Sequence, residues 1–218
     1  MRWASNFLST SIGRKQLMAL TGLMMSGFLV GHLSGNLMLF AGDGGVKFNA
    51  YAAWLGSQVW LVPAELGLVL ILLVHFGLAW RLSMQNRRAR GSRYRHKDAS
   101  DAGLGSRTML LSGMLVLFFL IIHLKTFKYG DHSGPQGLYG LVVAEFRDPI
   151  YSSFYILSMI VLGFHLSHGI QSAFQTFGLH HPTHHRALKR VLVFLAIVLC
   201  IGFATMPLWF MTAGRSAG

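Results

Sequence analysis

The sequence predicts an all-α membrane protein in which five helices cross the bilayer. Of the 218 residues, 53% are hydrophobic and only 12% are charged, whereas a soluble domain carries about 25% charged residues. Mean hydropathy is +0.49. Five apolar segments approach the length of about 20 residues that a spanning helix needs, at residues 17–40, 61–80, 108–124, 150–177 and 191–211. We therefore treat residues 1–218 as one transmembrane domain, and a soluble enzyme is excluded.

Three of these segments need comment. The first follows Arg14 and Lys15, as the apolar part of a signal peptide would, but it is too long for one. The third is short for a span, and the fourth is long enough that we expect it to tilt. Between them, the glycine-rich outer residues 128–148 are expected to hold a short helix over the membrane surface.

The basic residues predict the orientation of the chain. Lys and Arg collect on the cytoplasmic side of membrane proteins. With the N-terminus inside, fourteen of the 19 Lys and Arg lie on that side, and the outer five are Lys47, Lys125, Lys128, Arg147 and Arg215. We expect a cytoplasmic N-terminus and an outer C-terminus. The net charge of +12 then reflects topology, and no nucleic-acid partner is expected.

Five histidines lie inside the apolar segments, where ionisable groups are costly and usually functional. They are His32, His75, His123, His165 and His168. At 1.5 Å per residue, His32 lies about 25 Å outward from Lys15, and His123 lies about 24 Å outward from Arg107. Both belong near the outer face. His75 lies only about 9 Å from Arg81, and His165 about 24 Å inward from Pro149, so both belong to the inner half.

These depths give two pairs of histidines, and each pair comes from two different helices. Facing imidazoles in an apolar bundle are typical of bis-histidine haem ligation, and no acid lies at these depths to complete a zinc or iron carboxylate site. The first four helices are therefore predicted to surround two b-type haems. His32 and His123 would hold the outer haem, and His75 and His165 the inner one. His168 shares nearly the same helix face as His165, and spacing alone does not choose between them.

Other residues are candidates for secondary roles. The absence of a CxxCH motif excludes covalent c-type haem. Haem propionates need cations at the membrane edge, and the candidates for the inner haem are Arg14, Lys15, Arg107, Lys189 and Arg190. The single Cys200 excludes a disulfide framework. The histidine-rich residues 180–185 are interpreted as a polar inner loop.

Four runs around these histidines carry a resemblance to a known family. They are residues 28–36, 73–75, 121–124 and 163–169. With them the chain resembles the five-helix, dihaem cytochrome b subunit of succinate dehydrogenase and fumarate reductase, the b558-type membrane anchor. The family pattern Phe-His-x-Ser-x-Gly matches residues 164–169. It assigns the ligand role to His165 and none to His168.

The resemblance implies partners, cofactors and a reaction. The chain would anchor a flavoprotein with FAD and an iron–sulfur subunit to the cytoplasmic face of a bacterial inner membrane. That soluble pair would interconvert succinate and fumarate. Electrons would pass between the iron–sulfur clusters, the two haems and a quinone, commonly menaquinone in this family.

The quinone needs a proton partner and a pocket. Glu65 lies near the outer end of the second helix, and a carboxylate at a wet membrane edge can exchange protons with a quinone. Asn49, Tyr51 and Trp60 are candidate pocket residues. Some dihaem relatives carry a Glu two residues before the fourth-helix ligand, which is implicated in proton movement, but this chain has Gly163 there.

Two alternatives stay open at this stage. A dihaem cytochrome b that anchors a hydrogenase or formate dehydrogenase would share the four histidines but not the run at 164–169. A small proton-coupled transporter would use the histidines as proton relays, with broken helices and no cofactor.

Overall fold

The computed structural model describes residue 7 and residues 10–89, 104–179 and 185–213. Within these residues, five helices are long and apolar enough to cross a membrane, which confirms the predicted fold class. They are α2 (Ser11–Asn36), α4 (Leu61–Ala89), α5 (Leu104–His123), α7 (Pro149–Thr176) and α8 (His185–Ala213). The helix α2 continues into the 3₁₀ turn η1 (Leu37–Phe40), and α5 continues into the π-helix η2 (Leu124–Lys128).

Two shorter helices complete the described chain. The helix α6 (Gly137–Arg147) confirms the short helix expected between the third and fourth spans. The helix α3 (Val46–Gly56), between the first and second spans, was not expected. Several spans also extend beyond the apolar segments, most clearly α4, which runs on to Ala89. Its last turns carry Arg87 and Arg88, and such charges end an apolar segment without ending a helix that emerges into water.

Local sequence signals explain where two spans begin. The Thr10 side chain caps α2 by accepting a hydrogen bond from the Gly13 amide at 3.0 Å. Asp148 caps α7 by accepting from the Ile150 amide at 2.7 Å, and Pro149 occupies the first helical position, where its missing amide proton costs nothing. Side chains of these types satisfy amide groups that have no partner inside the helix.

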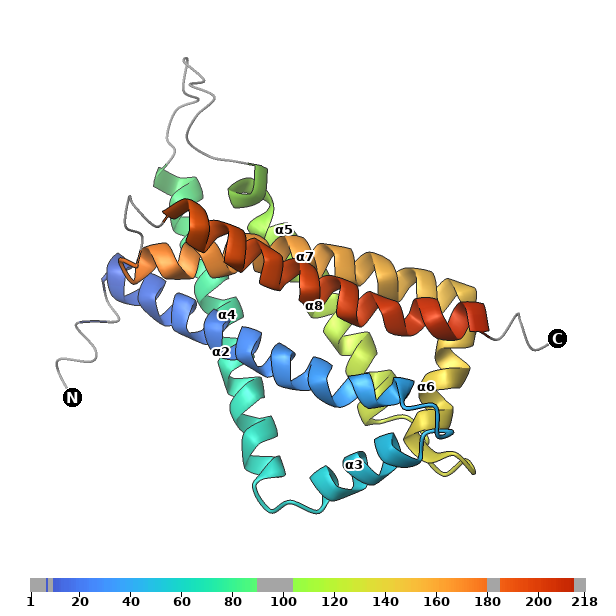
Figure 1. Ribbon diagram of the computed structural model, residues 1–218. Coiled ribbons are helices and arrows are strands. Elements are labelled where there is room, and N and C mark those ends of the chain that lie inside the picture. Colours follow the sequence, from blue (N-terminus) through green and yellow to red (C-terminus); the bar gives the residue numbers. More distant parts are fainter. Residues whose placement is uncertain (1–6, 8–9, 90–103, 180–184, 214–218) are drawn as a thin grey trace.

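The helix α7 lies in the middle of the bundle and packs against α2, α5 and α8. Figure 1 shows α2, α7 and α8 running alongside one another. The helix α4 packs against α2 and touches α5 only slightly. The tightest core lies between α7 and α8, where Met159 and Leu199 are almost fully buried. The fifth span is thus an integral part of the bundle, in addition to the first four.

A glycine allows the close packing of α7 and α8. A Cβ added at Gly163 would lie 2.9 Å from the Cβ of Cys200. A larger side chain at position 163 would push α8 away from α7. This contact gives a structural reason for glycine at position 163.

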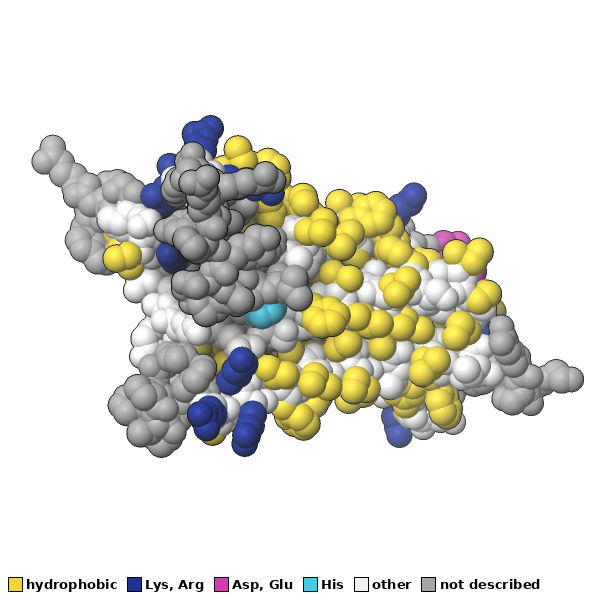
Figure 2. Space-filling view, turned by 90° about the horizontal axis from the view of Figure 1, so that it is seen from above, with side chains coloured by type: hydrophobic (Ala, Val, Ile, Leu, Met, Phe, Trp, Pro, Cys, Tyr) yellow, Lys and Arg dark blue, Asp and Glu magenta, His cyan; other side chains and the backbone are white. Residues whose placement is uncertain are grey.

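The surface of the bundle suits a bilayer. Figure 2 shows hydrophobic side chains over the middle of the visible face, with Lys and Arg gathered mainly toward one end. Large apolar side chains such as Leu66, Phe118 and Phe194 are more than half exposed. A contiguous apolar surface of this kind would be unstable in water, and it supports the assignment of a multi-pass membrane protein.

Candidate functional site

The structure brings His32 and His123 together near the η1 and η2 ends of α2 and α5. Their ring centroids lie 5.8 Å apart, with the ring planes nearly perpendicular at 87°. Phe28 stacks on His32 at 5.3 Å, and Phe119 stacks on His123 at 5.7 Å. The fifth span also contributes, because Phe203 of α8 lies 5.8 Å from the His32 ring. We call His32 and His123 the outer pair.

The other two predicted histidines also lie close to each other. His75 of α4 and His165 of α7 are near enough to interact electrostatically, and both are half-buried. We call them the inner pair. His32 thus lies with His123, and His75 with His165, and each of the four histidines comes from a different helix.

Hydrogen bonds define how the ring of His75 is oriented. Its Nδ1 lies 3.2 Å from the carbonyl oxygen of Met18 and 3.1 Å from the hydroxyl of Thr21, both on α2. A carbonyl oxygen can only accept, so this contact requires the proton on Nδ1. The other ring nitrogen, Nε2, then keeps its lone pair and can bind a metal ion.

His165 is oriented in the same way by α5. Its Nδ1 lies 3.1 Å from the hydroxyl oxygen of Ser112. That hydroxyl donates its own proton to the carbonyl oxygen of Met109 at 3.1 Å. It is therefore free to accept a proton from Nδ1, and Nε2 of His165 again keeps its lone pair.

Two glycines leave room for the inner pair. A Cβ added at Gly22 of α2 would lie 3.2 Å from Cε1 of His75, and one added at Gly113 of α5 would lie 3.3 Å from Cε1 of His165. Both distances are tighter than ordinary van der Waals contact. Each inner imidazole is thus placed by a hydroxyl and an adjacent glycine of the neighbouring helix.

His123 of the outer pair has a different partner. Its Nδ1 lies 2.7 Å from the phenol oxygen of Tyr155 on α7. The ring of His32 contacts Asn36 of the same helix, whose amide nitrogen lies 3.5 Å from the ring. That amide also donates to the His32 carbonyl at the shorter distance of 2.8 Å. Three of the four imidazoles therefore have an Nδ1 partner on a neighbouring helix.

Sequence reasoning did not identify Thr21, Ser112 or Tyr155. One signal was available for all three. The depth arithmetic places Thr21, shortly after Lys15, near the level of His75, and it places Ser112, shortly after Arg107, near the level of His165. It also places Tyr155 near the level of His123. The choice of facing side chain depends on helix rotation, which depth does not give.

His168 is placed differently from His165. It is exposed, whereas His165 is half-buried and faces Ser112. The placement favours His165, and not His168, as the residue that α7 contributes to the inner pair. The other histidine cluster of the sequence, residues 180–185, lies outside the residues whose side chains the structure describes.

Glu65 lies near the N-terminal end of α4, in an ion pair with Lys128 of η2. Both side chains are more than one-third exposed. This pair links α4 to the end of α5, two helices that otherwise touch little.

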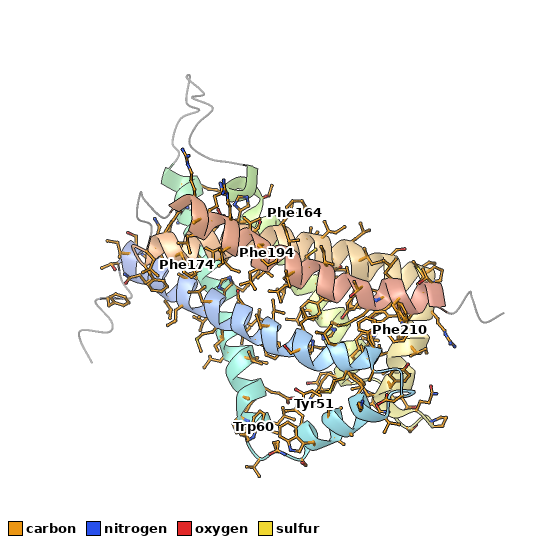
Figure 3. All side chains as sticks on the ribbon, viewed as in Figure 1. Tyr51, Trp60, Phe164, Phe174, Phe194 and Phe210 are labelled. Atoms are coloured by element: carbon orange, nitrogen blue, oxygen red, sulfur yellow. The ribbon has the colours of Figure 1, made fainter. Side chains whose placement is uncertain are left out.

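The three candidate pocket residues lie close to the same end of the molecule but differ in their contacts. Asn49 joins α3 to α6, because its amide donates to the Gln136 carbonyl at 2.7 Å and accepts from the Tyr139 amide at 3.0 Å. Tyr51 packs closely on α2 at Gly35. Trp60 is half exposed, and Figure 3 shows it with Tyr51 where α3 leads into α4.

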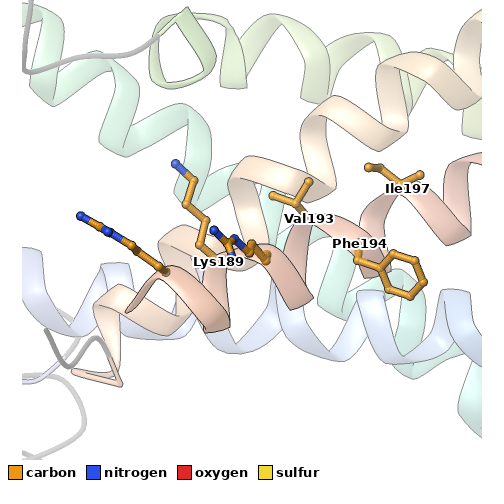
Figure 4. Close-up of a pocket in the computed structure, with 6 residues that line it drawn as sticks. Lys189, Val193, Phe194 and Ile197 are labelled. Carbon is orange, nitrogen blue, oxygen red and sulfur yellow. The ribbon is translucent and has the colours of Figure 1, made fainter. Parts of the chain in front are cut away.

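The basic candidates lie at the opposite end. Arg14 is buried, and its Nε donates to the Thr10 carbonyl at 3.1 Å, whereas Lys15 is exposed. Lys189 and Arg190 line a shallow hollow of ≈ 370 Å³ on α8 (Figure 4). The hollow is continued by Val193 and Ile197, on a face of α8 other than the one buried against α7. The side chain of Arg107 lies outside the described residues.

Comparison with known families decides the identity of this bundle. A family described as the succinate dehydrogenase/fumarate reductase transmembrane subunit matches residues 84–204, more than half of the chain. The chain belongs to this family. No curated protein and no solved structure matches the chain.

The matched residues cover only part of the site of this transmembrane subunit. They include His123 and His165, one histidine of each pair. His32 and His75 precede the match, and their pairing with the matched histidines comes from the structure alone. Membership in the family assigns the chain a membrane-anchor role in an enzyme complex and disfavours both alternatives left open by the sequence.

Proposed function

We propose that this transmembrane subunit is the cytochrome b anchor of a succinate:quinone oxidoreductase in a bacterial cytoplasmic membrane. In this proposal it holds two b-type haems and passes electrons between an iron–sulfur subunit and a membrane quinone. The observation that carries the proposal is the arrangement of four histidines from four helices as two pairs, His32 with His123 and His75 with His165. Haem ligation by paired imidazoles in a helical bundle needs such an arrangement.

The donor set fits haem better than another metal. His75 and His165 bond a neighbouring helix through Nδ1, which leaves Nε2 as the nitrogen available to iron. Such outer-shell hydrogen bonds orient metal-binding histidines and raise their basicity. Among the described residues, no group of three or more His, Cys, Asp or Glu could hold a metal ion, so a zinc or carboxylate iron site is not supported.

When bound, a b-type haem at each pair supplies a one-electron carrier. The chain's own residues set the position of these carriers. Ser112 and His123 both lie on α5, and the rise of the helix separates them by about 16 Å along its axis. The two pairs therefore form successive levels across the apolar core, with α5 and α7 contributing to both.

The ends of the bundle suit different tasks. Arg14, Lys15, Arg107, Lys189 and Arg190 are proposed to contact the inner haem's propionates at the cytoplasmic end. The flavoprotein and iron–sulfur subunits would dock over the inner pair at that end, with the N-terminus cytoplasmic. At the other end, Glu65 would exchange protons with the quinone, for which menaquinone is the proposed species.

The Glu65–Lys128 ion pair supports that last role in one respect. Both side chains of the pair are more than one-third exposed, so the Glu65 carboxylate is in contact with water. A proton acceptor for quinol chemistry needs such access to water. Tyr51 and Trp60 are proposed to line the pocket, whereas both ends of the Asn49 amide are already bonded to α6.

The proposal is tested by purifying the intact complex through a tag on this chain, in a mild detergent. We expect FAD and iron–sulfur clusters to copurify, and we expect succinate to reduce bound b-type haem, which a quinone then reoxidises. A preparation with the soluble partners but without a haem α-band would contradict the cytochrome assignment. A haem-containing preparation that lacks the soluble partners and is inert to succinate would contradict the choice of complex.

A further inference from the structure

The hydroxyl of Tyr155 is a polar group on a buried side chain that contacts a proposed haem ligand. It lies 2.7 Å from Nδ1 of His123, and the tyrosine side chain is buried at 7% exposure. The contact crosses from α7 to α5. No sequence motif marks this tyrosine, and the family match assigns it no role.

The ring of Tyr155 is held in a cluster of aromatic side chains from three helices. Phe119 of α5 meets it edge-on at 4.8 Å, and Phe146 of α6 meets it edge-on at 4.9 Å. Phe127 of η2 lies 6.2 Å away. Edge-to-face contacts of this kind restrict a ring to one orientation, so the hydroxyl is presented to His123 at a defined position.

We propose that Tyr155 is the positioning residue of the outer pair and that it acts through His123; this inference rests on the proposed function. An imidazole that binds iron through Nε2 carries its proton on Nδ1, and it then donates that proton to the Tyr155 oxygen. The hydrogen bond fixes the ring's tautomer and rotation. It also raises the electron density of the imidazole, which favours oxidised iron.

The inner pair provides an internal comparison. Its two imidazoles bond an aliphatic hydroxyl or a carbonyl, through Ser112, Thr21 and Met18. In the outer pair His123 contacts a phenol, and among the described residues the ring of His32 has a 3.5 Å contact with the Asn36 amide of its own helix. Removal of the phenol hydroxyl should therefore change the outer haem and leave the inner haem unchanged.

The test compares three single substitutions in the intact complex. Tyr155→Phe keeps the ring and its packing but deletes the hydroxyl. Tyr151→Phe is the matched control, because Tyr151 belongs to the same cluster on α7 and its buried hydroxyl has no hydrogen-bond partner among the described residues. Ser112→Ala removes the corresponding partner of the inner pair. The readouts are the potentiometric titration of each haem band and the low-spin electron paramagnetic resonance signals.

We expect Tyr155→Phe to retain both haems, to shift the outer haem to a more positive potential and to alter its resonance signal. Ser112→Ala should do the same to the inner haem only, and Tyr151→Phe should change neither. If Tyr155→Phe does not assemble, 3-fluorotyrosine at position 155 keeps the hydroxyl as a weaker acceptor and should also shift only the outer potential. An unchanged outer haem in the assembled variant would overturn the positioning role, whereas absence of haem from the parent complex would instead overturn the proposed function.

Discussion

Ser112 of α5 and His165 of α7 are joined by a hydrogen bond of 3.1 Å between hydroxyl and Nδ1. A second hydrogen bond joins the same two helices with the roles exchanged, because here the histidine, His123, lies on α5 and its partner, Tyr155, lies on α7. Each helix therefore carries a histidine and the side chain that orients the other helix's histidine. This reciprocity ties the two levels of the site to one interface, between helices α5 and α7, which pack against each other.

The close approach of Gly113 to His165 predicts a selective effect of a single methyl group. Gly113→Ala places a Cβ 3.3 Å from Cε1 of His165, so the ring must rotate or move. We expect the inner haem to shift in spectrum or be lost, while the outer haem stays bound. Haem content and the difference spectrum of the purified complex measure this.

Gly77→Ala is the control for that substitution. A Cβ at Gly77 of α4 meets nothing within 4 Å, and replacing helical Gly by Ala favours the helix by about 1 kcal/mol. Both haems should be unchanged in this variant. Equal perturbation of the inner haem by both substitutions would show that the effect comes from helix propensity and not from contact with His165.

His168 is predicted to be dispensable for haem binding. Its side chain is exposed, whereas His165 is half-buried and contacts Ser112. His168→Ala should keep two haems per chain with unchanged spectra. If His168→Ala loses one haem and His165→Ala keeps both, then His168, and not His165, is the haem ligand of α7.

Glu65 is predicted to act in quinone chemistry and not in haem binding. Glu65→Gln keeps the size of the side chain but removes its ability to accept a proton. We expect quinone-dependent turnover to fall by about tenfold or more, since positioned proton transfer contributes about 10²-fold to 10⁴-fold. Succinate oxidation with a soluble dye acceptor should be unchanged.

Lys128→Met serves as the companion of that variant. It breaks the same ion pair but leaves the carboxylate in place, so the loss of turnover should be smaller. If the two variants lose equal activity, Glu65 acts only by holding α4 to η2. If neither variant loses activity, the proton transfer runs elsewhere.

The partner subunits are predicted to cover the basic end of the bundle. In a Cys200→Ala background, single cysteines replace Asn86, near the Arg87 end of α4, and Ser133, between η2 and α6. Both positions are exposed. Labelling of the cysteine at 86 should fall when the soluble subunits are bound, and labelling at 133 should not change. Protection at position 133 alone would invert the proposed topology.

Hydropathy and charge were sufficient to predict the five spans, because each is dominated by apolar residues of the right length. They did not predict the helix ends. The 3₁₀ turn after Asn36 and the π-helix after His123 depend on local backbone hydrogen bonding that composition does not report. Helix α3 was also missed, since it is too short to show a span.

Helical rise converts residue number into depth, so the sequence gives an expected level for each histidine. It does not give the side chains that those histidines contact. Thr21, Ser112 and Tyr155 contact imidazoles only because of how each helix is rotated about its axis, and the packing of four neighbours sets that rotation. The role of α8 was missed for the same reason, since Phe203 carries no signal that it lies beside His32.

The pairing of the four histidines is tested most directly by the haem-to-polypeptide ratio and the low-temperature difference spectrum of four alanine variants. The parent complex should hold two haems per chain. His32→Ala and His123→Ala should each lose the same spectral species, and His75→Ala and His165→Ala should each lose the other, which leaves one haem per chain in every variant. The proposed pairing of the histidines is contradicted if His32→Ala and His75→Ala remove the same spectral species while the other haem remains.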